Sequence, residues 1–194
     1  MASNNIEIEA KVLLSKKDYE KVLAKLNFGD TSTIQTNYYL DSDDRILKKY
    51  GMVLRIRQAN NKSILTMKAP LAEGLLEKDQ TLPQKDADSL IDHNIFPRGD
   101  ISDFLDILQI PTSKMKVLAH MTTERKEVDY QGTTIDISKN TYSKKVDYEI
   151  ECDSDAALTS QNTLRDICAN LDIEFKINTL SKETRAINAA MDEK

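Results

Sequence analysis

Hydrophobic and polar residues alternate along short stretches of the chain, which is the pattern of half-buried β-strands. In residues 6–12 the side chains of Glu7, Glu9 and Lys11 fall on one face and apolar side chains fall on the other. Two carboxylates about 6.5–7 Å apart along such a face repel each other unless a cation lies near them, and the lysine beside them favours an anion. The face is typical of a solvated, salt-bridged strand, and it also fits a metal-assisted phosphate site.

Alternation elsewhere predicts further strands, and apolar residues at helical spacing predict helices. The predicted strands cover residues 33–40, 52–58, 63–69, 75–82, 116–130 with a break near residue 121, 133–138 and 146–152. The predicted helices cover residues 15–28, 86–93, 102–108, 156–171 and 181–191. Gly51, Asn60-Asn61 and Gln131-Gly132 are turn signals between strands. Two runs of antiparallel strands, each followed by helices, favour an α+β domain over alternating βαβ units.

Composition adds limits on the class of protein. Of the 194 residues, 40% are hydrophobic and 30% are charged, so we expect one folded domain over residues 1–194. The net charge of -5 argues against a general nucleic-acid-binding surface, although a local basic pocket is compatible with it. We expect Cys152 and Cys168 to be buried and unreactive. Because the sequence shows no secretory signal and no long apolar run, we expect a cytoplasmic protein that does not cross a membrane.

Several predicted strands carry like charges two residues apart. Arg55 and Arg57 share one face of a strand, and Glu149 and Glu151 share a face of another. Arginine pairs suit phosphate because the planar guanidinium donates two parallel hydrogen bonds, whereas carboxylate pairs suit Mg²⁺ or Mn²⁺. If the sheet closes on itself, these ionic faces line a lumen and the apolar faces pack against helices. In an open sheet, the same residues would form a solvent-exposed face.

The order of these motifs resembles that of the CYTH family, the triphosphate tunnel metalloenzymes. The resemblance extends over nearly the whole chain, from residue 4 to residue 188. It rests on EIEAK at 7–11, NYYLD at 37–41, LRIR at 54–57, LTMK at 65–68, Arg125, Asp136, YEIE at 148–151, and Ser181-Lys182 with Arg185. It implies an α+β fold with a closed or nearly closed eight-stranded antiparallel β-barrel, or tunnel. Helices would pack outside this barrel, and the C-terminal helix would lie near one tunnel end.

The resemblance also implies roles for individual residues. The implied phosphate-binding residues are Lys11, Arg55, Arg57, Lys68, Arg125, Lys182 and Arg185. The implied metal-binding residues are Glu7, Glu9, Glu77, Asp136, Glu149 and Glu151. Lys68 and Tyr39 are the implied catalytic residues and would orient an attacking water. Three plainer interpretations stay open: Tyr39 as a wall residue of the barrel, Lys182 and Arg185 as a helix-surface pair, and residues 41–44 as a solvated turn.

A triphosphate bound in such a lumen can undergo more than one reaction. The predicted function is hydrolysis of inorganic tripolyphosphate or of a nucleoside or other organic triphosphate, with Mg²⁺ or Mn²⁺ as cofactor. The chain lacks the HGRIF-like element that cyclase members tend to carry, and it has no tryptophan to stack on a thiamine ring. Two alternatives stay open: an adenylate cyclase that makes cyclic AMP from ATP, and a non-catalytic polyphosphate- or nucleotide-binding module. The expected partner is a triphosphate-bearing small molecule, and assembly as a homodimer is left open.

Overall fold

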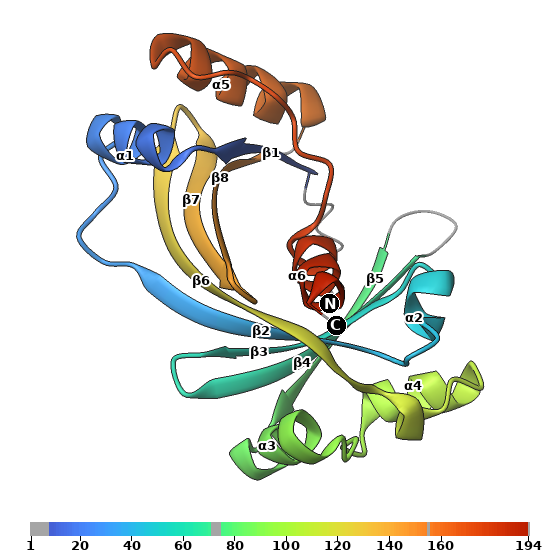
Figure 1. Ribbon diagram of the computed structural model, residues 1–194. Helices are drawn as coiled ribbons and strands as arrows, with labels where there is room; N and C mark the ends of the chain where they lie inside the picture. Colours follow the sequence, from blue (N-terminus) through green and yellow to red (C-terminus); the bar gives the residue numbers. More distant parts are fainter. Residues whose placement is uncertain (1–7, 71–74, 155, 194) are drawn as a thin grey trace. The chain divides into compact units, whose positions relative to one another are not determined.

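The computed structural model describes residues 8–70, 75–154 and 156–193 (Figure 1). Glu7, one of the predicted metal-binding residues, lies outside the described residues. The chain divides into two compact units. Unit 1 comprises Met1–Ile34 and Thr123–Ser181, and unit 2 comprises Gln35–Thr122 and Lys182–Lys194, as far as these residues are described. The single domain expected over residues 1–194 stays a prediction.

Eight strands of the described residues form one sheet, in the order β1-β8-β7-β6-β2-β3-β4-β5. They are β1 (Ile8–Leu14), β2 (Thr33–Asp41), β3 (Val53–Ala59), β4 (Lys62–Pro70), β5 (Leu75–Leu82), β6 (Lys116–Tyr130), β7 (Thr133–Tyr142) and β8 (Lys145–Ser154). The helices are α1 (Lys16–Lys25), α2 (Ile46–Lys49), α3 (Gln84–His93), α4 (Asp100–Ile107), α5 (Ala157–Asn170), α6 (Lys182–Asp192) and the short 3-10 helix η1 (Thr112–Lys114).

This arrangement confirms the predicted fold class, an α+β fold built on eight antiparallel strands. Strands β1 and β5 stand at the two ends of the strand order. The predicted break near residue 121 is wrong, because β6 is continuous over its 15 residues. In the part of the chain that the structure describes, every helix is too short or too polar to span a membrane.

In unit 1 the apolar faces of β1, β7 and β8 pack against α1 and α5 (Figure 1). Val12 and Ile150 are completely buried in this core. Cys152 and Cys168 lie there too as free thiols, which confirms their predicted burial. Burial raises the pKa of the Cys168 thiol to about 11, which keeps it protonated and poorly nucleophilic at neutral pH.

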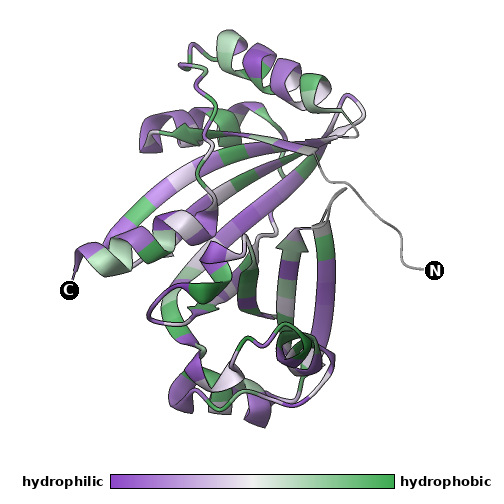
Figure 2. Ribbon diagram, turned by 90° about the vertical axis from the view of Figure 1, so that its right-hand side faces the viewer, coloured by the Kyte–Doolittle hydropathy of each residue, from purple (hydrophilic) through white to green (hydrophobic). Residues whose placement is uncertain are grey.

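In unit 2 the apolar faces of β3, β4 and β5 pack against α3 and α4. Leu54 and Ile56 of β3, and Leu65 and Met67 of β4, are completely buried. Figure 2 shows the resulting alternation of hydrophilic and hydrophobic bands along the strands. Because alternate side chains enter this core, the charged residues between them are left on the opposite face of the same strands.

The predicted hairpin turns are confirmed, but one turn differs from its prediction. Asn60 and Asn61 have φ angles of 50° and 58°, and Gln131 and Gly132 have φ angles of 52° and 81°. Such left-handed pairs match the twist of two-residue hairpins. Residues 41–44 are not simply a solvated turn, because Asp41 is buried at the end of β2. The short helix α2 that follows was not predicted.

Candidate functional site

Unit 2 carries a row of polar side chains that crosses four neighbouring strands. Tyr39 on β2 lies opposite Arg55 on β3, which in turn lies opposite Thr66 on β4. Thr66 lies opposite Asp79 on β5, and its hydroxyl donates to the Asp79 carboxylate at 2.7 Å. The Nε atom of Arg55 is buried and has no hydrogen-bond partner among the described residues. A buried N–H donor without an acceptor is costly, so the row is suited to receiving an acceptor from a ligand.

Two cross-strand pairs flank this row on the same face of unit 2. Arg57 lies opposite Asn37 and donates from Nε to the side-chain oxygen of Asn37 at 3.2 Å. Lys68 lies opposite Glu77, with 3.0 Å between Nζ and Oε2. Arg57 and Lys68 are each two residues from a member of the row, so strand alternation puts them on its face. The structure thus brings together Arg55, Arg57, Lys68 and Glu77, as the sequence predicted.

Tyr39 is almost completely buried at the β2 end of the row. Burial raises the pKa of its phenol to about 12, although the nearby Arg55 and Lys182 oppose the rise. The phenol therefore stays protonated at neutral pH and can donate a hydrogen bond to an anion.

Tyr39 and Lys68 do not lie opposite each other. Strand β3 stands between their strands, which places the two backbones about 10 Å apart. Lys68 pairs with Glu77 instead. The predicted joint role of Tyr39 and Lys68 in orienting a water stays a prediction.

The beginning of α6 adds basic side chains to unit 2. Lys182 lies near enough to Tyr39 to affect the pKa of the phenol. Arg185, one turn further along α6, is buried, with only 7% of its surface exposed. Arg185 is therefore not an exposed helix-surface side chain, which argues against the surface-pair interpretation for this residue.

Unit 1 carries a second ionic row, across β1, β8, β7 and β6. Lys11 lies opposite Glu151, and Glu151 lies opposite Asp136. Arg125 donates to both carboxylate oxygens of Asp136, from Nε to Oδ1 at 2.9 Å and from Nη2 to Oδ2. Arg125 also pairs with Glu127 at 2.9 Å. Two predicted phosphate-binding residues and two predicted metal-binding residues thus meet on one face of unit 1.

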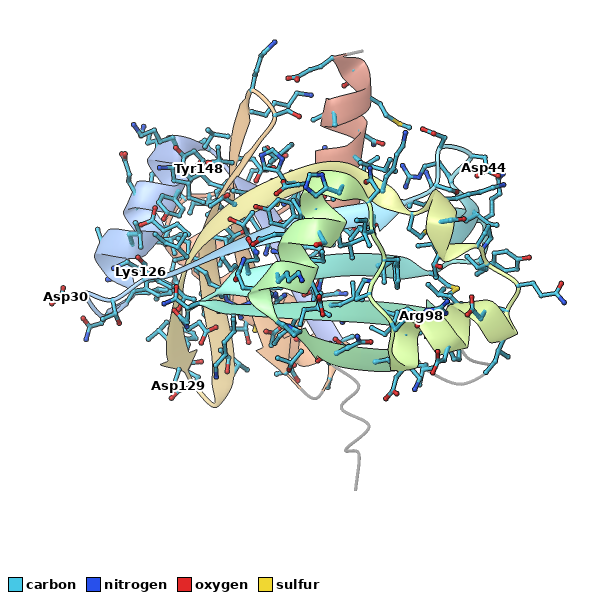
Figure 3. The ribbon with its side chains drawn as sticks, turned by 90° about the horizontal axis from the view of Figure 1, so that it is seen from below. Asp30, Asp44, Arg98, Lys126, Asp129 and Tyr148 are labelled. Carbon is cyan, nitrogen blue, oxygen red and sulfur yellow. The ribbon has the colours of Figure 1, made fainter. Side chains whose placement is uncertain are left out.

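Lys126, the residue after Arg125, is engaged elsewhere. Its Nζ donates to the carbonyl of Gly29 at 2.8 Å and to that of Asp30 at 3.4 Å. Figure 3 shows Lys126 and Asp30 near one another at the margin of unit 1. Because neighbouring side chains of a strand point to opposite faces, Arg125 joins the ionic row and Lys126 does not.

Three of the predicted metal-binding carboxylates are almost completely buried in unit 1. Asp136, Glu149 and Glu151 are 1%, 0% and 5% exposed. Burying several carboxylates together is unfavourable without added positive charge, and an all-oxygen donor set suits a hard divalent cation. The donor chemistry therefore fits a divalent metal ion. Within the described ranges, however, no three His, Cys, Asp or Glu side chains are already gathered closely enough to hold one. Glu9, a fourth predicted metal-binding residue, is half-exposed and pairs with Lys11.

The Asp136 carboxyl should make the stability of the metal-free protein depend on pH. Burial raises its pKa to about 7, and Arg125 only partly opposes the rise. Because an unfolded aspartate titrates near pH 4, the folded chain retains a proton between about pH 4 and 7 that the unfolded chain has released. The free energy of unfolding should therefore fall as the pH rises through this range, by at most about 1.4 kcal/mol per pH unit from this group.

Urea unfolding at several pH values measures this dependence. The Asp136→Asn variant cannot titrate at this position, so its unfolding free energy should fall less steeply between pH 4 and 7. Equal slopes in the two proteins would contradict the raised pKa of Asp136.

Two polar residues on this face of unit 2, Asn37 and Asp79, were not among the site residues predicted from the sequence. The signal was present, because Asn37 lies two residues before Tyr39 and Asp79 lies two residues after Glu77. Each therefore shares a strand face with a predicted site residue. Which hydrogen bonds they make depends on the register between strands, which the sequence does not reveal.

Comparison with known proteins places this chain in a family. The model of the CYTH domain family matches residues 5–187. A protein of Bacillus subtilis (strain 168) named "Putative triphosphatase YjbK" is 35% identical over 150 residues, which cover 77% of this chain and 77% of that protein.

Solved structures agree with this match. A crystal structure from Bacillus halodurans, titled as that of a "putative adenylate cyclase", is 32% identical with a TM-score of 0.81, covering 93% of this chain and 97% of the other. The Hippeastrum protein HpAC1, whose title ascribes to it a dominant triphosphatase activity, has a TM-score of 0.78 at 19% identity, covering 95% and 96%. At that identity the likeness concerns the fold alone. Since the family model covers nearly the whole chain and a relative shares more than a third of the aligned residues, this chain belongs to the CYTH domain family.

Proposed function

We propose that the chain is a divalent-metal-dependent hydrolase that cleaves a triphosphate, either inorganic tripolyphosphate or a nucleoside or other organic triphosphate. The observation that carries the proposal is Arg55, whose buried Nε lacks a hydrogen-bond partner among the described residues, in a row of hydrogen-bonding side chains. Phosphate oxygens are strong acceptors for a guanidinium. The name of the Bacillus subtilis relative supports a triphosphatase.

Basic residues would bind and orient the phosphate chain. These residues are Lys11, Arg55, Arg57, Lys68, Arg125, Lys182 and Arg185. Arg57 and Lys68 are held by Asn37 and Glu77, so their positive groups are oriented before a ligand arrives. Tyr39 would donate from its neutral phenol to a phosphate oxygen.

In the reaction, a water oxygen forms a bond to the terminal phosphorus while the bond from that phosphorus to the bridging oxygen breaks. The bridging oxygen takes the electron pair of the broken bond and leaves with the shortened phosphate chain, while the proton lost by the water passes to solvent and phosphate is released. Positive side chains lower the barrier because negative charge grows on the leaving bridging oxygen. Lys68 and Tyr39 would orient the attacking water.

Carboxylates would hold the metal ion, which we propose is Mg²⁺ or Mn²⁺. The carboxylates that would hold such an ion are Glu9, Asp136, Glu149 and Glu151 in unit 1, with Glu7 outside the described residues. In unit 2 the candidate metal-binding carboxylate is Glu77. When bound, such an ion supplies positive charge to phosphate oxygens and acidifies a water. The burial of Asp136, Glu149 and Glu151 supports this role, because a divalent cation would offset their mutual repulsion.

An adenylate cyclase is the second candidate function, because the Bacillus halodurans structure at 32% identity carries that title. A cyclase would form a bond between the ribose hydroxyl and the α-phosphorus of ATP and release pyrophosphate. The third candidate is a non-catalytic polyphosphate- or nucleotide-binding module. Such a module would bind the ligand through the same basic residues but would not convert it to a product. A cytoplasmic location and a homodimer stay predictions.

One panel of assays separates these candidates. The purified protein is incubated with tripolyphosphate, ATP or thiamine triphosphate in Mg²⁺, Mn²⁺ or EDTA, and both phosphate and cyclic AMP are measured. We expect metal-dependent phosphate release without cyclic AMP. Cyclic AMP from ATP would support the cyclase instead, and tight binding without any product would support the binding module.

A further inference from the structure

The loop that connects β2 to α2 in unit 2 is fixed by one buried carboxylate. Asp41 is 2% exposed. Its Oδ1 accepts the backbone N–H groups of Ser42 at 2.8 Å and Leu47 at 2.9 Å, and its Oδ2 accepts that of Lys48 at 3.2 Å. The same Oδ2 accepts the side-chain Nε of Arg45 at 3.0 Å. Asp41 therefore holds both the backbone of this loop and the arginine side chain within it. Because Asp41 is two residues after Tyr39, which lies opposite Arg55, it stands on the same face of β2 as Tyr39.

Asp41 orients the Arg45 side chain but pairs with only one of its guanidinium nitrogens. Its φ angle of 55° lies in the left-handed region, which residues other than glycine seldom adopt. Its side chain is 18% exposed. Of its side-chain nitrogens, only Nε makes a hydrogen bond or ion pair within the described residues, so the two terminal nitrogens of the guanidinium are available to an acceptor. The bidentate fork of arginine suits a phosphoryl group.

Glu183, on the first turn of α6, is half-buried among cations of unit 2. Burial raises the pKa of its carboxyl and the nearby Asp41 carboxylate adds to the rise, whereas Arg45, Lys48 and Arg55 are near enough to oppose it. Yet the Glu183 carboxylate forms no hydrogen bond or ion pair within the part of the chain described. Glu183 thus lies near three positive side chains and the Asp41 carboxylate without pairing directly with any of the three cations. A group of higher negative charge would interact with these cations more strongly.

We propose that Arg45, oriented by Asp41, forms with Lys48 an anion subsite next to Arg55, and that Glu183 is the anion facing this subsite when no ligand is bound. This inference rests on the proposed function. The subsite would take a second phosphoryl group of a ligand whose first phosphoryl group lies at Arg55, so it favours tripolyphosphate over a single phosphate. The entering phosphoryl group would be attracted by Arg45 and Lys48 and repelled by Glu183.

The two residues should therefore affect ligand affinity in opposite directions. Titration calorimetry with tripolyphosphate in EDTA measures affinity without turnover. Arg45→Gln should weaken binding by about 10- to 100-fold, the contribution of a lost charged hydrogen bond. Glu183→Gln should tighten binding by about tenfold, because it removes a nearby like charge. Inorganic phosphate serves as the comparison ligand, and its affinity should change much less in Arg45→Gln.

Lys49→Gln is the matched control, because it removes one positive charge at the end of α2, the helix that follows Arg45, from a residue whose Nζ lies 3.8 Å from Asp44. It should change affinity by less than about twofold. If Arg45→Gln does not fold, Arg45→Lys keeps the charge but loses the fork, and it should still weaken tripolyphosphate binding.

Unchanged binding in the Arg45 variants, or weaker binding in Glu183→Gln, overturns the proposed subsite. A wild-type chain that binds no tripolyphosphate overturns it as well. A wild-type chain that binds tripolyphosphate but releases no phosphate with Mn²⁺ overturns the hydrolase function instead.

Discussion

Arg55→Ala should lower kcat/KM for tripolyphosphate by about 10²–10³-fold, as expected for the loss of one preorganised donor to a reacting phosphate. Arg55 stands in the middle of the unit 2 row, between Tyr39 and Thr66. Its buried Nε has no hydrogen-bond partner among the residues described. Because that donor is not used in holding the fold, the variant should keep most of its stability without ligand. Steady-state phosphate release and thermal unfolding, with and without tripolyphosphate, measure both quantities.

Arg98→Ala is the matched control for this prediction. The Arg98 side chain is 87% exposed on the loop before α4, where it lies 3.5 Å from Asp106 and is labelled in Figure 3. Its removal should leave kcat/KM within about twofold, because an exposed ion pair contributes little. If Arg55→Ala mainly unfolds the protein and Arg98→Ala does not, Arg55 is a structural residue and its predicted role in phosphate binding is wrong.

Glu151→Gln should lower metal-dependent activity by more than about 100-fold, since even the outer partners of metal ligands contribute 10- to 100-fold. Glu151 is 5% exposed and lies between Lys11 and Asp136 in the unit 1 row. The substitution removes one of several neighbouring buried charges of the same sign. The melting temperature of the metal-free chain should therefore stay the same or rise, while the additional stabilisation by Mn²⁺ should disappear.

The exposed Glu174 provides the control for Glu151, as Glu174→Gln makes the same chemical change outside the row. It should retain both activity and the stabilisation by Mn²⁺. Full activity in Glu151→Gln would refute its assignment as a metal ligand. A large loss of stability in the metal-free Glu151→Gln protein would show instead that the carboxylate holds the unit 1 sheet together.

Local patterns in the sequence predicted most of the elements. The strand predicted at residues 75–82 has the same bounds as β5, and the two-residue turns lie where Asn60-Asn61 and Gln131-Gly132 indicated. The short helix α2 was missed because four residues are too few to show helical periodicity. Its stability comes from the Asp41 carboxylate, which replaces hydrogen bonds that such a short helix cannot make within itself.

Strand alternation alone determined which charged residues share a face. Arg55 with Arg57, and Glu149 with Glu151, follow directly from a side-chain period of two residues. The sequence motifs also placed the chain in its family, with the expected eight antiparallel strands. The choice of the basic residues of β3 and the carboxylates of β8 as candidates therefore needed nothing beyond the order of residues in the chain.

Only the tertiary structure decided which of these residues become partners. Register between strands pairs Lys68 with Glu77 rather than with Tyr39, and joins Arg125 to Asp136. Burial raises the pKa of Tyr39 and Asp136, and the fold of unit 2 places Glu183 among the cations around Arg45. Alternation is a property of consecutive residues, whereas pairing and desolvation depend on segments that are distant in the chain. For that reason the sequence determined the charged faces, and the fold determined their chemistry.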